Sequence, residues 1–193
     1  LEVAAAIQRR FFPTEAPEVP GLDIAGQALP AEETSGDLYD LVLRPDGRLL
    51  VAVGDVSGHG VGPALLMSEV RAYLRAMAGL ALTPAEILTR IDGLLRPDLG
   101  DGAFVTLLLV EIDTTTREFA WANAGHVDGL RLAPEGVLRE HLGPTGPALG
   151  VLDAPSFGLR RGAALAPGEV LLLVTDGVTE SPGHDGAPLE EEG

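Results

Sequence analysis

The sequence predicts an α+β fold built from antiparallel β-sheets. Segments with the alternation or the apolar runs of strands come first, two helical segments follow, and further strand-like segments complete the chain. Short turns that contain glycine, proline or aspartate join neighbouring strands, as they do in hairpins. A parallel sheet would need a helix after nearly every strand, and this chain does not alternate in that way.

The chain opens on a segment with the pattern of an amphipathic helix. Val3, Ile7 and Phe11 recur at a spacing of four residues, and a proline ends the pattern. We therefore expect a helix over residues 1–12, whose apolar stripe could form a homodimer. Because the first methionine is Met67, we also expect the sequence to be a piece of a longer protein.

The next segments predict a loop, a strand and a hairpin. Residues 22–28 and 36–43 have the alternation of strands, and residues 49–55 form an apolar run that ends on an aspartate. A turn of proline, aspartate and glycine joins the last two segments into a hairpin. In an antiparallel hairpin the start of one strand lies beside the end of the other, so Asp37 and Asp55 should fall at the same end of the sheet.

Two helices follow this hairpin. After a turn rich in glycine, residues 63–80 carry apolar side chains at helical spacing. Thr83 begins the second helix, since its side chain can cap the helix while Glu86 completes a capping box. Both helices should bury one face against the sheets.

From Ala103 onward the pattern is again that of strands. Residues 104–112 form a nearly continuous apolar run, and residues 117–123 alternate after a short turn, which predicts a second hairpin. Residues 169–175 form a last buried strand that ends on Asp176. Shorter strands are expected between these at residues 129–132, 137–140 and 157–161.

Composition excludes several classes of function. The net charge of −16 at pH 7 argues against nucleic acid or an anionic membrane surface as the main partner. The chain has no cysteine, which excludes disulfides, thiol catalysis and thiolate metal sites, and we expect a cytoplasmic protein. We expect no insertion into a membrane, because no apolar segment of the sequence approaches the length of a membrane span.

Three carboxylates stand apart from the other acidic residues, because Asp37, Asp55 and Asp176 each lie at a strand end beside a glycine. Carboxylates brought together repel one another unless a cation lies among them, and oxygen ligands favour hard ions such as Mg²⁺ or Mn²⁺. Two such ions that share one aspartate could activate a water molecule for attack on a phosphoryl group. A purely structural Ca²⁺ site is the alternative.

Three other polar residues lie near these strand ends. Asp40 comes three positions after Asp37, so in a regular strand it faces the other side of the sheet. His59, in the glycine-rich turn, could orient water, act as an acid or bind backbone carbonyls, and His126 at the end of a strand is more typical of a structural residue. We expect neither histidine to be a metal ligand.

The order and spacing of several motifs resemble those of one enzyme family. The motifs are Ser35-Gly36-Asp37-Leu38-Tyr39-Asp40, Gly54-Asp55-Val56-Ser57-Gly58-His59-Gly60, Asn123-Ala124-Gly125-His126 and Val174-Thr175-Asp176-Gly177-Val178-Thr179-Glu180. Together they resemble the SpoIIE/RsbU branch of the PPM (protein phosphatase 2C-like) serine/threonine phosphatases. Ile7-Gln8 followed by Phe12-Pro13 resembles the linker segment before such domains.

The resemblance implies a sandwich of two antiparallel β-sheets flanked by α-helices, in αββα layers, with two Mn²⁺ or Mg²⁺ ions at one edge. Asp55 would bridge both ions, Asp37 and the backbone carbonyl of Val56 would hold one of them, and Asp176 would hold the other. The implied substrate is a phosphoserine or phosphothreonine protein, often an anti-sigma factor antagonist in a partner-switching pathway. Residues 1–12 would then be the linker helix from an upstream regulatory or sensor domain.

The sequence departs from the family pattern near its end. The family has a later aspartate on a final strand, in an Asp-Asp-x-Thr-like segment, and this sequence stops at Gly193 without it. We therefore expect residues 13–193 to be a phosphatase domain that lacks its C-terminal strand and has weak or no activity. Two alternatives are a noncatalytic PPM-like signalling or binding module with an incomplete metal centre, and a metal-dependent hydrolase of small phosphoesters.

Overall fold

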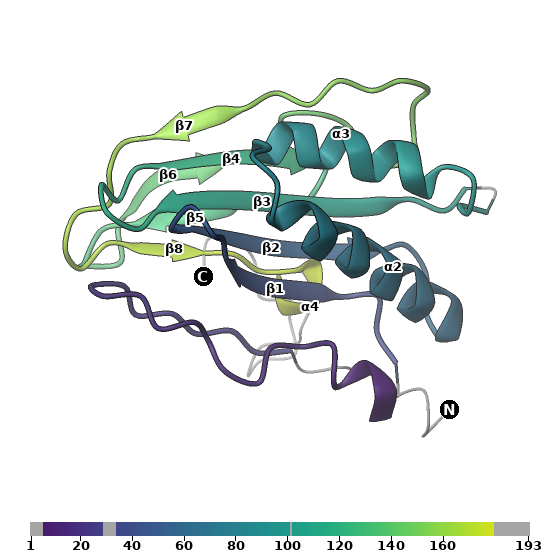
Figure 1. Cartoon of the computed structure of the whole chain (residues 1–193), viewed down its shortest axis with the longest axis horizontal. Coiled ribbons are helices and arrows are strands. Elements are labelled where there is room, and N and C mark those ends of the chain that lie inside the picture. The colour runs from purple at the N-terminus through teal and green to yellow at the C-terminus, as the bar shows by residue number, and fades with distance from the viewer. Residues whose placement is uncertain (1–5, 29–33, 101, 180–193) are drawn as a thin grey trace.

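The computed structural model describes residues 6–28, 34–100 and 102–179, which form two antiparallel sheets and two long helices (Figure 1). The five-stranded sheet has the order β1 (Leu38–Leu43), β2 (Arg48–Val56), β3 (Val105–Asp113), β4 (Phe119–Ala124), β7 (Arg160–Gly162). The three-stranded sheet has the order β6 (Leu138–Leu142), β5 (Gly129–Leu132), β8 (Val170–Leu172). The helices are α2 (Val61–Ala78), α3 (Pro84–Leu95) and the short α4 (Asp176–Thr179).

The five-stranded sheet lies between a layer of helices and the second sheet. Helices α2 and α3 cover one of its faces, and β5, β6 and β8 lie behind the other (Figure 1). Successive residues of a strand face opposite sides, so β3 contributes to both cores. Leu107 and Leu109 pack with the helices, whereas Leu108 and Val110 pack with the second sheet. Burial on both faces explains why this strand is a nearly continuous apolar run.

Both predicted hairpins are present. In the first, β1 pairs with β2 so that Leu38 lies opposite Gly54. In the second, β3 pairs with β4 so that Leu107 lies opposite Ala124. Strand β2 also pairs with β3, which places Asp55 opposite a threonine of β3. The predicted α+β fold with antiparallel sheets is therefore confirmed.

The helix ends show how local sequence sets the boundaries. The hydroxyl of Thr83 accepts a hydrogen bond from the Glu86 amide at 3.3 Å, and the Glu86 carboxylate accepts one from the Thr83 amide at 2.8 Å, which confirms the predicted capping box. Helix α2 begins at Val61, two residues before the predicted start. The residue before it, Gly60, has a φ of 89°, a conformation that favours glycine.

A buried arginine closes the other end of α2. Arg44 is 4% exposed, and its guanidinium donates hydrogen bonds to the carbonyl oxygens of Ala78 and Leu82 at 3.1 and 3.0 Å. The same guanidinium forms an ion pair with Glu111 of β3. A cation suits the carbonyl end of a helix, because the last carbonyls have no partner within the helix.

The N-terminal segment differs from its prediction. Residues 6–8 are helical, but the backbone then turns, with the amides of Arg10 and Phe11 donating to the carbonyls of Ile7 and Gln8 at 3.1 and 2.8 Å. The helix predicted for residues 1–12 therefore ends early among the described residues, and its first part, residues 1–5, lies outside them. Among the described helices, none has both the length and the apolar character needed to cross a membrane.

The strand predicted over residues 22–28 is wrong. This segment belongs to a long loop that runs from the N-terminal turn toward the far end of the sheets and back (Figure 1, purple). Leu22 and Ile24 pack on the second core, which produces a strand-like alternation without a strand. The hydroxyl of Tyr39 lies 3.1 Å from the carbonyl oxygen of Pro13 and 3.2 Å from that of Gly26, so one side chain holds both limbs of the loop.

Candidate metal centre

The first hairpin brings two of the predicted site residues together. Asp37 directly precedes β1, and Asp55 is the second-last residue of β2. Because Leu38 lies opposite Gly54, the two aspartates fall at the same end of the sheet, as the hairpin predicted. Their charges interact, since Asp37 contributes to the raised pKa of Asp55.

A glycine allows the chain to pass directly over the end of β2. A Cβ atom at Gly36 would lie 2.6 Å from the carbonyl oxygen of Val56 and 2.9 Å from a carboxylate oxygen of Asp55. Real side chains do not tolerate such distances, so residue 36 must be glycine for the turn to sit there. The close approach places the Asp37 turn against the two groups of β2 that the family resemblance names as ligands.

Electrostatics link the third aspartate to the same site. The pKa of Asp55 is raised from 3.8 to about 6, first by burial and then by the negative charges of Asp37 and Asp176, and a hydrogen bond from the Val56 backbone partly offsets the rise. A partly buried carboxylate beside two like charges is costly to ionise. A divalent cation would remove that cost, so the residues present fit a metal.

The site residues are better placed to bind a metal ion on the Asp37 side than on the Asp176 side. Asp176 is exposed at the start of α4, although its charge reaches Asp55. Within residues 6–28, 34–100 and 102–179, no group of three acidic, histidine or cysteine side chains is arranged to hold a metal ion. The three aspartates therefore share an electrostatic field without forming a closed set of ligands.

Ser35 is a site residue that the sequence patterns did not reveal. Its hydroxyl lies 3.0 Å from a carboxylate oxygen of Asp37, to which it donates, and it accepts a hydrogen bond from the Asp37 amide at 3.0 Å. This small turn fixes the Asp37 side chain relative to its own backbone. The resemblance includes Ser35 in its first motif but names no role for it.

His126 connects the two sides of the site through hydrogen bonds at both of its ring nitrogens. Its Nε2 lies 3.0 Å from the carbonyl oxygen of Val174, and its Nδ1 lies 2.8 Å from the hydroxyl of Thr106, the residue opposite Asp55. Because a carbonyl can only accept, Nε2 carries a proton, and the neutral ring then accepts from Thr106 at Nδ1. Burial lowers the pKa of His126, which favours this neutral form.

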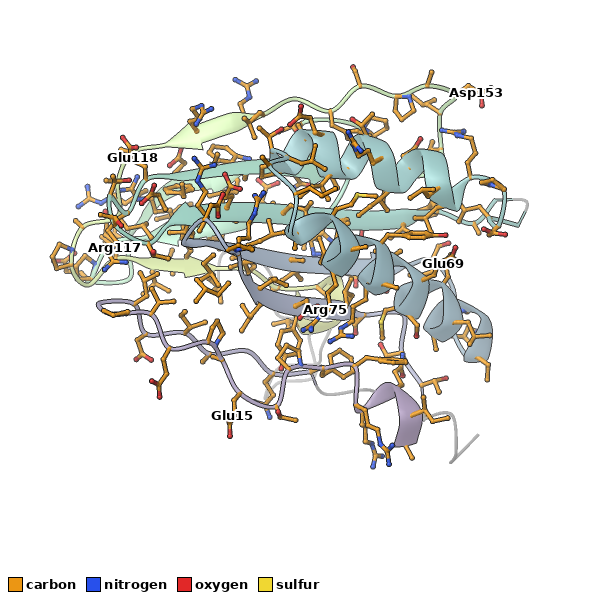
Figure 2. All side chains as sticks on the ribbon, in the orientation of Figure 1. Glu15, Glu69, Arg75, Arg117, Glu118 and Asp153 are labelled. Atoms are coloured by element: carbon orange, nitrogen blue, oxygen red, sulfur yellow. The ribbon has the colours of Figure 1, made fainter. Side chains whose placement is uncertain are left out.

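Asp40 belongs to a different contact from the one that holds Asp37. It is fully buried and faces α2, where its carboxylate accepts from Arg75 Nε and Nη2 at 2.6 and 2.7 Å and lies 3.2 Å from Arg71 Nε. Figure 2 shows Arg75 between α2 and β1. Asp40 therefore joins a helix to the sheet, as the alternation of β1 indicated, whereas His59 is exposed in the glycine-rich turn.

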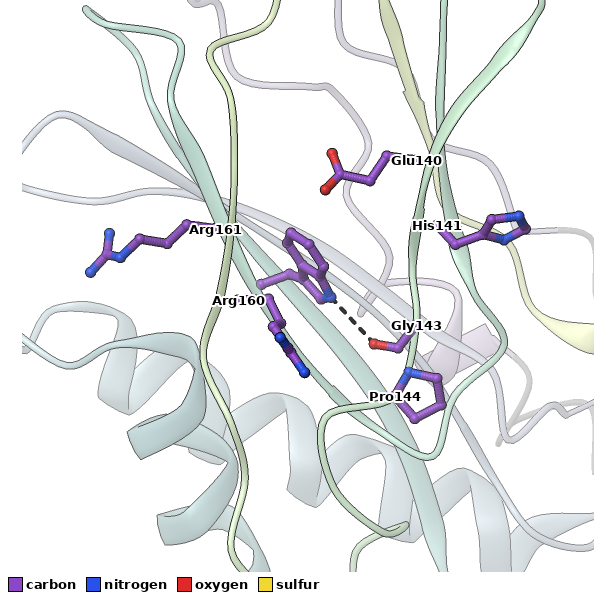
Figure 3. Close-up of a pocket in the computed structure, with 7 residues that line it drawn as sticks. Glu140, His141, Gly143, Pro144, Arg160 and Arg161 are labelled. Atoms are coloured by element: carbon purple, nitrogen blue, oxygen red, sulfur yellow. Dashed lines mark hydrogen bonds between the residues drawn. The ribbon is translucent and has the colours of Figure 1, made fainter.

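A hollow elsewhere on the molecule contains none of these residues. It has a volume of about 380 Å³ and is lined by residues of β4, β6 and β7 together with Gly143 and Pro144 (Figure 3). The indole of Trp121 crosses it and donates a hydrogen bond to the carbonyl of Gly143 at 3.3 Å. The side chains of Arg161 and His141 point away from each other in Figure 3, so the hollow does not present them as a common charged site.

Comparison with known families agrees with the geometry. The model of the family described as Stage II sporulation protein E (SpoIIE) matches residues 45–193, which include Asp55 and Asp176. The chain belongs to the SpoIIE family. This SpoIIE family chain has the PPM (protein phosphatase 2C-like) architecture that its motifs implied, with two antiparallel sheets and helices packed on them.

Individual relatives extend over most of this SpoIIE family chain. RsbU of Bacillus subtilis (strain 168), named a phosphoserine phosphatase, is 26% identical over 189 residues, which are 96% of this chain and 55% of RsbU. The crystal structure of the RsbU and RsbW domains of Rv1364c from Mycobacterium tuberculosis has a TM-score of 0.69 at 32% identity, over 81% of this chain and 44% of that one.

The PP2C domain of SiaA from Pseudomonas aeruginosa shares the fold over nearly the whole chain. Its TM-score is 0.75 at 24% identity, and the match covers 99% of this chain and 76% of the SiaA chain. The chain described here spans only about half the length of RsbU.

Proposed function

We propose that this domain is a metal-dependent protein serine/threonine phosphatase that hydrolyses phosphoserine or phosphothreonine. The proposal rests on the environment of Asp55. Burial and the charges of Asp37 and Asp176 raise the pKa of this carboxylate to about 6. Carboxylates that share an electrostatic field in this way are suited to a divalent cation. The match to RsbU, which is named a phosphoserine phosphatase, supports the same activity.

The proposed ligands divide between two ions, Mn²⁺ or Mg²⁺. Asp55 would bridge both, Asp37 and the carbonyl of Val56 would hold one, and Asp176 would hold the other. Such a pair of ions supplies a water molecule with a lowered pKa and a clamp for the phosphoryl group. The chain contributes the position of the ligands, because Gly36 lets the Asp37 turn rest on the end of β2.

The proposed substrate and partners follow from the family. The substrate is a phosphorylated protein, such as an anti-sigma factor antagonist in a partner-switching pathway. Residues 1–12 are the proposed link to an upstream regulatory domain, with residues 13–193 as the phosphatase domain, and the same N-terminal segment is the proposed contact of a homodimer. The docked turn at residues 6–13 supports a link that ends directly against the domain.

One observation favours a second candidate, a noncatalytic PPM-like module that signals or binds a partner. Within the part of the chain that the structure describes, no three ligand side chains are arranged for a metal. A module of this kind would keep the fold and bind a partner protein without hydrolysing phosphate. It would have no chemical reason to keep Asp37, Asp55 and Asp176, which is why we place it second.

Two measurements on the 193-residue chain separate these candidates. The first is the rate at which it releases phosphate from a phosphoserine protein in Mn²⁺, compared with Asp55→Asn and with the exposed control Asp23→Asn. The enzyme proposal predicts a Mn²⁺-dependent rate that Asp55→Asn abolishes and Asp23→Asn retains. The second is Mn²⁺ binding by calorimetry. A wild-type chain that exceeds Asp55→Asn neither in rate nor in Mn²⁺ affinity would reject the enzyme, and partner binding without hydrolysis or Mn²⁺ binding would support the module.

A further inference from the structure

Gln8 is buried in a short turn, residues 6–10, whose other side chains face solvent. It is 5% exposed, whereas its neighbour Ile7 is 50% exposed and Arg9 is also exposed. Burying a primary amide is costly unless its oxygen and nitrogen find hydrogen-bond partners. The helical turn at residues 6–8 therefore presents its polar side chain inward and an apolar one outward, which is the reverse of ordinary helix packing.

Both polar atoms of Gln8 bind the backbone of one distant residue. Gln8 Nε2 donates to the carbonyl oxygen of Ser35 at 2.5 Å, and the Ser35 amide donates to Gln8 Oε1 at 3.0 Å. The side chain thus replaces a neighbouring strand as the partner of Ser35, 27 residues away in sequence. Two complementary bonds to the backbone of one residue fix its position and its orientation.

Ser35 passes this restraint to the metal centre. Its hydroxyl forms the turn that holds the Asp37 carboxylate and amide, both at 3.0 Å. The next residue, Gly36, rests directly on Asp55 and Val56. The turn is therefore held from one side by Gln8 and supported from the other by the end of β2.

Independent contacts anchor the segment that carries Gln8. The ring of Phe12 stacks on Tyr39 of β1 with 5.6 Å between centroids, and the guanidinium of Arg71 lies 5.8 Å above the ring of Phe11. Arg71 belongs to α2 and also contacts Asp40. The position of Gln8 is consequently set by β1 and α2, and does not depend on the Ser35 turn alone.

We propose that Gln8 is a positioning residue for the metal centre, which holds the Ser35–Asp37 turn so that the Asp37 carboxylate stays beside Asp55 and thereby raises the affinity for a divalent cation. This inference rests on the proposed function, since it assumes that Asp37 and Asp55 bind metal. Residues that orient metal ligands through a hydrogen bond typically change metal affinity by about 10–100-fold when they are replaced.

The test measures Mn²⁺ binding to the metal-free chain by titration calorimetry. Gln8→Leu removes both hydrogen bonds, and Gln8→Glu keeps the acceptor for the Ser35 amide but sets a carboxylate oxygen against the Ser35 carbonyl. Gln27→Leu makes the same chemical change at an exposed position of the N-terminal loop and serves as the control. Circular dichroism and thermal unfolding in EDTA report whether each variant folds without metal.

The expected result is a loss of Mn²⁺ affinity of about tenfold or more in both Gln8 variants, with unchanged affinity in Gln27→Leu. Ser35→Ala tests the next contact, because it keeps the backbone that Gln8 binds but removes the hydroxyl that holds Asp37. It should weaken Mn²⁺ binding without loosening the N-terminal segment. A role for Gln8 in stability alone would lower the unfolding temperature in EDTA and leave the affinity of the folded chain unchanged.

Each other outcome has a distinct meaning. Folded Gln8 variants that bind Mn²⁺ like the wild type would overturn the inference and leave the proposed metal centre intact, and so would a Ser35→Ala variant with wild-type affinity. Failure of both Gln8 variants to fold in EDTA would also overturn it, because Gln8 would then serve the fold. A wild-type chain that binds no more Mn²⁺ than Asp55→Asn would reject the proposed function itself.

Discussion

Replacing Asp55 by asparagine should stabilise the metal-free protein and destabilise the metal-bound one relative to the wild type. Asparagine has nearly the same shape and can still accept the hydrogen bond from the Val56 backbone. It carries no charge, so it does not repel Asp37 or Asp176. The substitution therefore removes an unfavourable interaction from the metal-free protein and a ligand from the metal-bound protein.

The size of the effect follows from the pKa of Asp55. The pKa rises from 3.8 to about 6 in the folded protein. Since one pKa unit corresponds to about 1.4 kcal/mol, ionising this carboxylate in the fold would cost about 3 kcal/mol before solvent screening. Asp55 is only partly buried, and screening reduces the cost to about 1–2 kcal/mol. For a chain of this length that amounts to about 2–8 °C in unfolding temperature.

The effect depends on pH with a defined sign. The folded-state pKa of Asp55 lies above its unfolded value, so the folded protein binds this proton more tightly than the unfolded chain does. Ionisation of Asp55 therefore lowers the stability of the metal-free wild type as the pH rises from about 4 to about 6. Asp55→Asn lacks this loss, so the two proteins should differ little at pH 4 and by the full amount at pH 7.5.

Differential scanning calorimetry in EDTA, at pH 4, 5, 6 and 7.5, measures this difference. The exposed variant Asp23→Asn controls for the general effect of removing one negative charge from a protein of net charge −16. Mn²⁺ at about one hundred times its Kd should then stabilise the wild type by about 2.7 kcal/mol. Because that gain exceeds the cost of ionising Asp55, the order of the two unfolding temperatures should reverse.

Either of two results would refute this reasoning. If Asp55→Asn unfolds at a lower temperature than the wild type in EDTA at pH 7.5, the carboxylate stabilises the metal-free fold and the repulsion is not present. If Mn²⁺ raises the unfolding temperature of both proteins equally, Asp55 does not bind the metal. A difference that is the same at pH 4 and at pH 7.5 would show that ionisation of Asp55 is not its cause.

Three further predictions concern other parts of the structure. Asp40→Asn should lower the free energy of unfolding by about 2–4 kcal/mol in urea titrations, because it removes the buried negative charge that pairs with Arg71 and Arg75. A loss below about 0.5 kcal/mol would contradict the ion pair. Gly36→Ala should weaken Mn²⁺ binding in calorimetry by about tenfold or more, because its Cβ would displace the turn from Val56. The far-ultraviolet circular dichroism spectrum should be retained. Unchanged Mn²⁺ affinity would argue against that turn as part of the site. Thr83→Ala should lower the free energy of unfolding by about 1 kcal/mol with no change in Mn²⁺ affinity, because it removes only a helix cap. An unchanged free energy of unfolding in urea would show that the capping box contributes nothing to stability.

The hairpins, the second helix and the meeting of Asp37 with Asp55 could be predicted because each depends on local chemistry. The buried strand predicted over residues 169–175 is wrong, because β8 covers only Val170–Leu172, is largely exposed, and ends before Asp176, which begins α4. The Thr83 cap is made by residues three positions apart, and β3 is mostly apolar because both of its faces are covered. A short turn fixes the register of β1 against β2, so the meeting of Asp37 with Asp55 followed from their positions in the sequence.

The alternation of residues 22–28 shows where a local pattern fails. A loop that lays Leu22 and Ile24 on a core has the same alternation as a strand, and only the missing ladder partners distinguish the two. The helical pattern over residues 1–12 was similarly followed only in part, because the backbone turns after residue 8. Propensity and alternation describe a segment alone, whereas its final backbone depends on the surface that it covers.

The sequence was sufficient for the fold class and for the meeting of Asp37 with Asp55, because hydrophobic period and turn chemistry act over a few residues. The contacts that support the centre required the folded molecule. Gln8 meets Ser35 across 27 residues and Asp40 meets Arg75 across 35. Which polar groups become partners at such separations is set by the packing of whole elements, and a buried polar side chain must then pair with whatever that packing places beside it.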